Sequence, residues 1–127
     1  MTNSIMLHTE GLTKYYGSLL ALDQLSLEVR AGEIVALVGP NGAGKTTALK
    51  LAVGLLRPSK GRVLIAGYDM HRQPLEAKRL LSFVPDQPFL YEQLTVAELL
   101  AFAGGVYQMP AEELRVRAEE LLGLFDL

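Results

Sequence analysis

The chain has 127 residues, of which half are apolar and a fifth are charged, and this composition is typical of a globular domain rather than of a disordered or fibrous protein. Its 12 basic and 14 acidic side chains give a net charge of −2, so no basic excess favours nucleic acid or an anionic lipid surface. Cysteine is absent, which excludes disulfides and thiolate metal sites and fits a reducing compartment. We expect no signal peptide, and the longest uncharged stretch, residues 99–111, is too short and too interrupted to cross a bilayer.

Three strand patterns precede a glycine-rich segment. Residues 25–30 alternate strictly between apolar and polar side chains, which predicts a strand with one wet face in an antiparallel sheet. Residues 5–9 indicate a weaker strand of the same type. Residues 34–38 are continuously apolar, as expected of a parallel strand that is covered on both faces.

The segment after the glycines predicts helices alternating with short strands. A helix can begin at residues 45–46 and end near Gly54, and its apolar positions include Leu49, Ala52 and Val53. A turn over residues 57–61 leads into a strand over residues 62–66. A second helix is expected from Pro74 to about Arg79, followed by a strand over residues 81–84.

Two helices are predicted near the end of the chain. Thr95 and Glu98 match a capping box, and apolar residues then follow at helical spacing. The last helix should begin near Pro110 with acidic residues in its first turn, and it should bury Leu114, Ala118, Leu121 and Leu122. The order of these elements predicts an α/β domain.

Residues 39–46, Gly-Pro-Asn-Gly-Ala-Gly-Lys-Thr, form a pattern that binds nucleotide phosphates. Glycines 42 and 44 allow backbone N–H groups to approach an anion closely, and the start of the following helix adds a favourable field. Lys45 can contact the β- and γ-phosphates, and the Thr46 hydroxyl can bind Mg²⁺. A dinucleotide site would need glycine at position 47, where Thr47 stands. The remaining alternative is a glycine-rich turn that binds nothing.

The chain resembles the ATP-binding subunits of ABC transporters, most of all the bacterial exporter type, over residues 12–17, 21–23, 39–47, 54–61 and 90–96. The resemblance implies a P-loop NTPase fold, with a RecA-like core and an antiparallel β subdomain. It places residues 1–94 in the β subdomain and part of the core, and residues 95–127 at the start of a helical subdomain within which the chain stops.

The resemblance also implies roles for individual residues. Tyr16 occupies the position of the aromatic residue that stacks on adenine, although it could instead be a half-buried tyrosine at a strand end. Asp86 stands where the family usually has Gln, so it is expected to contact Mg²⁺ together with Thr46, or else to be a solvated loop residue. The residues implied to bind ATP phosphates and Mg²⁺ are Gly39, Pro40, Asn41, Gly42, Ala43, Gly44, Lys45, Thr46 and Thr47.

The implied function is an ATPase that drives transport across a membrane, with export as the expected direction. ATP and Mg²⁺ are the implied cofactors, and a transmembrane permease subunit and a second nucleotide-binding subunit are the implied partners, with no nucleic acid. The permease would hold the subunit at the cytoplasmic face of the membrane. The family's signature loop, catalytic Glu and switch His have no match here, so no catalytic residue is assigned and residues 1–127 alone are expected to be inactive. A fragment that only binds nucleotide, or an ABC ATPase without a transport role, is the alternative.

Overall fold

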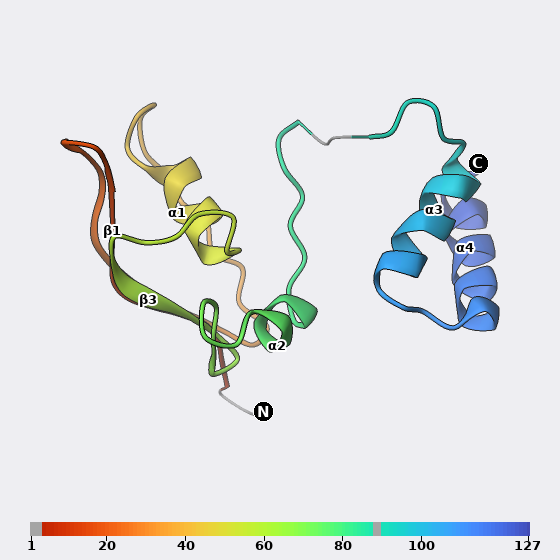
Figure 1. Cartoon of the computed structure of the whole chain (residues 1–127), viewed down its shortest axis with the longest axis horizontal. Coiled ribbons are helices and arrows are strands. Elements are labelled where there is room, and N and C mark those ends of the chain that lie inside the picture. The colour runs from red at the N-terminus through yellow and green to blue at the C-terminus, as the bar shows by residue number, and fades with distance from the viewer. Residues whose placement is uncertain (1–3, 88–89) are drawn as a thin grey trace. The chain divides into compact units, whose positions relative to one another are not determined.

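The computed structural model describes residues 4–87 and 90–127 of the chain. It separates into two compact units that divide after Val84. In the described residues, the first unit contains an antiparallel sheet with helices α1 (Lys45–Ala52) and α2 (Pro74–Arg79), and the second contains helices α3 (Val96–Val106) and α4 (Ala111–Phe125) (Figure 1). The α/β class that the sequence predicts is therefore confirmed.

The sheet contains strands β1 (Ile5–Tyr16), β2 (Leu19–Arg30), β3 (Lys60–Ile65) and β4 (Tyr68–Asp69) in the order β2-β1-β3-β4. Strands β1 and β2 form a long hairpin that is paired from Tyr16 with Leu19 to Ile5 with Arg30. Both strands are longer than the alternating pattern predicts, because pairing extends each of them to the two-residue turn. Gly17 in this turn has φ of 60°, a conformation that glycine adopts without strain.

One face of the sheet packs against the two helices and forms the core of the first unit. Its buried residues are Leu12, Leu51, Val63, Ile65, Met70 and Ala77. Thr9 of β1 is a buried polar residue. Its hydroxyl donates to the Leu25 carbonyl at 3.0 Å and accepts from the Leu27 N–H at 2.9 Å. A polar residue is stable there because both of its hydrogen-bonding roles are satisfied.

Helix α1 begins at Lys45, as the sequence predicts. Ala48 and Leu51 are its buried residues, whereas Leu49 is 47% exposed. The helix ends at Ala52, and Gly54 follows with φ of 72°, as is common after a helix C-terminus. Helix α2 has the predicted bounds.

Two predicted strands are not formed, over residues 34–38 and 81–84. Ile34 is 99% exposed and Val38 is 92% exposed, so the expected burial on both faces is wrong for this structure. The strands found in the described residues pair only with one another. Without a hydrogen-bonding neighbour, an apolar run cannot become a sheet strand.

The second unit is a helical hairpin whose first helix has the predicted capping box. The Glu98 N–H donates to Thr95 Oγ1 at 3.3 Å, and the Thr95 N–H donates to Glu98 Oε2 at 2.8 Å. Gly104 of α3 lies beneath the Leu114 side chain of α4, where a Cβ atom would clash. The hydrogen bonds of the box fix where α3 begins, and the small glycine lets α4 approach it closely.

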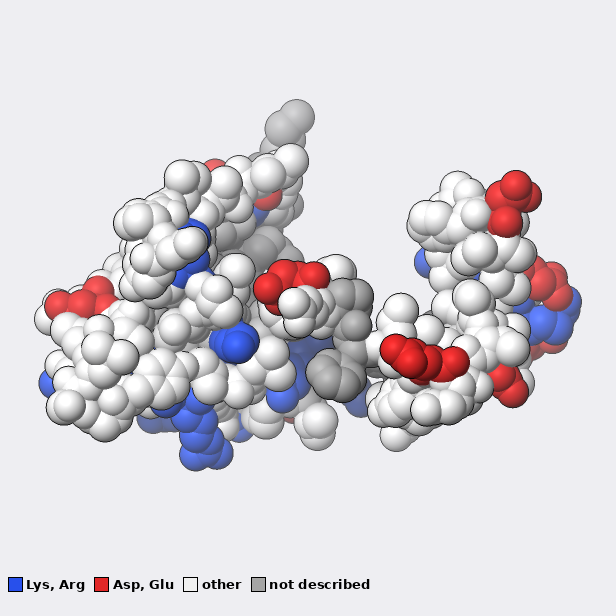
Figure 2. Space-filling view, turned by 90° about the horizontal axis from the view of Figure 1, so that it is seen from above, with Lys and Arg blue, Asp and Glu red and all other residues white. Residues whose placement is uncertain are grey.

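Helix α4 is less buried than its sequence pattern predicts. Leu114, Ala118 and Leu122 are half-buried, but Leu121 is exposed, contrary to expectation. Its outer surface carries ion pairs, including Arg115 with Glu112 and Glu119 at 2.7 Å each, and adjoining blue and red atoms are visible at the right of Figure 2. None of the helices described here has the length and apolar character needed to cross a membrane.

Candidate functional site

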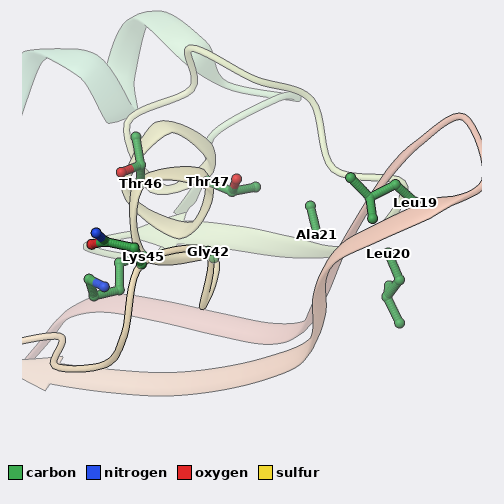
Figure 3. Close-up of a pocket in the computed structure, with 9 residues that line it drawn as sticks. Leu19, Leu20, Ala21, Gly42, Lys45, Thr46 and Thr47 are labelled. Carbon is green, nitrogen blue, oxygen red and sulfur yellow. The ribbon is translucent and has the colours of Figure 1, made fainter.

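The glycine-rich loop and the end of the β-hairpin enclose a pocket of about 310 Å³ in the first unit. Figure 3 shows the first turn of α1 on one side of this pocket and the start of β2 on the other. The lining residues are Leu19, Leu20, Ala21, Asn41, Gly42, Gly44, Lys45, Thr46 and Thr47. Six of the nine loop residues predicted from the sequence therefore line one cavity.

Two glycines give the loop its shape. Gly42 has φ of 84° and Gly44 has φ of 87°, values that L-amino acids with a side chain adopt only with strain. A Cβ atom on Gly44 would lie 2.5 Å from the carbonyl oxygen of Ala21 in β2. Gly44 thus allows the loop to pack directly on the strand that forms the opposite wall.

The start of α1 offers backbone donors to the pocket. Gly44 is the N-cap residue, and no side chain caps the helix. The first intrahelical bond runs from the Ala48 N–H to the Gly44 carbonyl at 2.8 Å, so the earlier N–H groups have no partner within the helix. The first turn also contains no acidic residue. This helix end is therefore suited to binding an anion.

Lys45 places a positive charge at the same helix end. Its ammonium group donates to the carbonyl oxygens of Gly39 at 2.5 Å and Pro40 at 2.7 Å. These bonds hold the side chain against the loop. Because an ammonium group has three donors, one remains for an oxygen of a bound anion.

Thr46 and Thr47 add hydroxyl groups to the pocket wall. Thr46 is exposed and Thr47 is half-buried. A hydroxyl oxygen is a hard ligand of the kind that Mg²⁺ prefers. The donor set of backbone N–H groups, one ammonium and hydroxyl oxygens fits a magnesium-bound polyphosphate.

The other predicted loop residues shape the site without lining the pocket. Gly39 and Pro40 provide the two carbonyls that hold Lys45, and Pro40 also accepts from the Ala43 N–H at 3.2 Å. Ala43 lies close to Gly39, because a Cβ atom on Gly39 would be 3.2 Å from that of Ala43. These contacts close the turn of the loop.

Tyr16 and Asp86 lie outside this pocket. Tyr16 is 47% exposed at the end of β1, and its strand partner Leu19 lines the pocket. Asp86 belongs to the second unit, where its carboxylate accepts from the Gln87 N–H at 3.0 Å. Their roles toward adenine and Mg²⁺ therefore stay predictions.

No local sequence pattern predicts that Leu19, Leu20 and Ala21 form an apolar wall of the pocket. These residues do not alternate with polar ones, so no local pattern marks them. Hairpin pairing with β1 brings them beside the loop. The one available signal is Gly17, which marks the turn.

Comparison with known proteins agrees with this geometry. The sequence model of the ABC transporter family matches residues 22–127. A sulfate/thiosulfate import ATP-binding protein, CysA, from Nephroselmis olivacea is 40% identical over 118 residues, which cover 93% of this chain and 34% of the relative. The SkfA peptide export ATP-binding protein SkfE from Bacillus subtilis is 36% identical over 117 residues, 92% of this chain and 48% of the relative.

A solved structure described as the ATP-binding subunit of an ABC transporter is 36% identical, with a TM-score of 0.81 over 92% of this chain and 49% of that one. The chain thus spans about a third to a half of the length of the proteins it matches. The matched family, the identities and the shared fold agree with one another. The chain belongs to the ABC transporter family and corresponds to part of its ATP-binding subunit.

Proposed function

We propose that residues 39–47 bind the phosphates of ATP together with Mg²⁺. One observation supports this most strongly: the Lys45 ammonium, the uncapped start of α1 and two glycines with positive φ meet at a single pocket. The combination of convergent backbone donors with one fixed cation is suited to a polyphosphate and gives no selectivity for the base.

The proposed roles follow from the chemistry of each group. Backbone N–H groups of the loop and the helix start hold the phosphate oxygens, and Lys45 supplies the balancing charge. The hydroxyl of Thr46 binds Mg²⁺. Asp86 is proposed as a metal ligand from the family resemblance alone. Bound Mg-ATP would supply the phosphoanhydride bond whose cleavage drives transport.

Substitution of Lys45 tests the phosphate site. Lys45→Ala removes the single ammonium at the helix start, and a hydrogen bond to a charged group contributes about 1.5–3 kcal/mol, so the Kd for ATP should rise roughly 10- to 150-fold. Lys50→Ala makes the same charge change in the last turn of α1 and should leave the Kd unchanged. Titration calorimetry with ATP and with tripolyphosphate measures both variants, and an unchanged Kd for Lys45→Ala would refute the proposed site.

Magnesium dependence tests the metal ligands. Thr46→Ala and Asp86→Asn should each reduce the gain in ATP affinity that Mg²⁺ provides, while affinity measured in EDTA stays the same. A variant that lowers affinity equally with and without Mg²⁺ would show that its residue does not act through the metal.

We propose that the protein containing this chain is an ATPase subunit that acts with a transmembrane permease and a second nucleotide-binding subunit at the cytoplasmic face of a membrane. Export is the proposed direction, because Asp86 resembles the acidic residue of exporter-type subunits. Relatives named for export and for import both occur, so direction needs its own test. Inside-out vesicles that contain subunit and permease should accumulate substrate with ATP, and daunorubicin, named in two relatives, is a suitable first compound.

We further propose that residues 1–127 by themselves do not hydrolyse ATP. Hydrolysis needs a positioned base for the attacking water and additional donors for the charge on the γ-phosphate. Neither is assigned to any residue of this chain. Phosphate release from Mg-ATP that depends on Lys45 would contradict this proposal.

A further inference from the structure

Lys14 connects the predicted adenine-stacking residue to the segment that follows α1. Its ammonium group lies over the ring of Tyr16, 5.4 Å from the ring centroid. The same group donates to the carbonyl oxygen of Arg57 at 2.7 Å. The side chain therefore makes a cation–π contact and a hydrogen bond at once.

The geometry of the strand explains this contact. Lys14 and Tyr16 are two residues apart in β1, so their side chains leave the same face of the strand. The carbonyl that anchors Lys14 is itself held in place, because residues 57–59 are bound to β1. The Ser59 N–H donates to the Thr13 carbonyl at 2.8 Å, and the Tyr15 N–H donates to the Ser59 hydroxyl at 3.0 Å.

We propose that Lys14 is a positioning residue for the nucleobase. Its anchored ammonium occupies one face of the Tyr16 ring and restricts the orientation of a side chain that is otherwise half-exposed. The opposite ring face is then presented to the base of the nucleotide whose phosphates lie on residues 39–47. This inference rests on the nucleotide binding proposed above and adds a residue that determines how the base is held.

The alternative is that Lys14 only stabilises the connection after α1 through the Arg57 carbonyl. The two roles differ in what they change. A positioning role affects the part of the binding energy that comes from the base, whereas a structural role affects ATP and tripolyphosphate alike. The ratio of the two affinities therefore separates them.

The experiment compares substitutions of Lys14 by titration of the 127-residue chain with Mg-ATP and with magnesium tripolyphosphate. Lys14→Met keeps most of the apolar stem and removes the charge. It should weaken ATP binding about two- to five-fold, because the base must then order a Tyr16 ring that has lost an exposed cation–π contact, and leave tripolyphosphate binding unchanged. Lys14→Arg should restore ATP affinity, because a guanidinium group can make both contacts. The exposed Lys60 provides the control, and Lys60→Met should change neither affinity.

Several outcomes would overturn the inference. They are an unchanged ratio of ATP to tripolyphosphate affinity in Lys14→Met, no rescue by arginine, or the same loss in Lys60→Met. Tyr16→Ala provides the second comparison and should lower ATP affinity at least as much as Lys14→Met. If Tyr16→Ala leaves the ratio unchanged, the base does not use this ring and the inference fails, while the phosphate site stands. Failure of the unsubstituted chain to bind tripolyphosphate would instead refute the phosphate site itself.

Discussion

Gly44 provides the sharpest test of how the loop is held against the sheet. Two effects act when Gly44 is replaced by alanine. Its φ of 87° costs a residue with a Cβ atom about 1–2 kcal/mol. The new Cβ atom would also lie 2.5 Å from the Ala21 carbonyl oxygen, and overpacking of this kind costs typically about 1–3 kcal/mol. Gly44→Ala should therefore destabilise the first unit by about 2–5 kcal/mol.

Gly42 is a matched control in the same loop. Its φ of 84° is nearly the same, but nothing lies within 4 Å of a Cβ atom built there. Gly42→Ala should therefore cost only the conformational part, about 1–2 kcal/mol, and the change in unfolded-chain entropy is common to both substitutions.

Urea unfolding followed by circular dichroism measures both changes, and the difference between them isolates the contact with Ala21. It should be about 1–3 kcal/mol, the share that overpacking adds. Equal destabilisation by the two substitutions would show that the loop does not pack on β2 as the structure has it.

Three further predictions concern positions outside the loop. Thr9→Val should destabilise the first unit by about 1–3 kcal/mol in urea unfolding, because two buried backbone groups lose the hydroxyl that pairs with them; a neutral result would mean that they find other partners. Thr95→Ala should reduce the helix content of the second unit and cost about 1 kcal/mol, and an unchanged far-UV spectrum and melting curve would argue against the capping box. Arg62 donates to Glu10 and holds the pKa of that carboxyl below its ordinary value. The pair therefore stabilises the folded state at pH values above the unfolded-state pKa of Glu10. This stabilisation is lost as the pH falls through the folded-state pKa of Glu10. Glu10→Gln should flatten the acid side of the stability profile, and an identical profile would show that the pair contributes nothing.

The elements predicted well from the sequence are those whose signals are local. Pro74 opens α2, and the capping box opens α3, as expected. The strand at residues 25–30 is recognisable because its alternation is strict. In each case the residues that determine the structure lie within a few positions of the element that they define. The element can therefore be predicted from one short segment of the sequence.

The sequence is less informative where a distant segment decides the outcome. The apolar pattern of α1 does not indicate which residues face the core, and packing against the sheet buries Ala48 and Leu51 while Leu49 stays exposed. Pairing of β2 with β1 brings Leu19 and Ala21 to the pocket, although their own sequence shows nothing unusual. The periodicity of a segment indicates which of its side chains can be buried, but not which other segment they will pack against.

Residues 34–38 show the same principle at the entrance to the site. A continuously apolar run predicts a strand only when neighbouring strands and covering layers exist, and the described residues pair elsewhere. The loop that follows nevertheless has a defined shape. It is held from its other side, through the contact of Gly44 with Ala21 and the hydrogen bonds of Lys45 to Gly39 and Pro40. The conformation of residues 39–47 in this chain therefore depends in part on α1 and β2, and this is why the Gly44 substitution tests the site so directly.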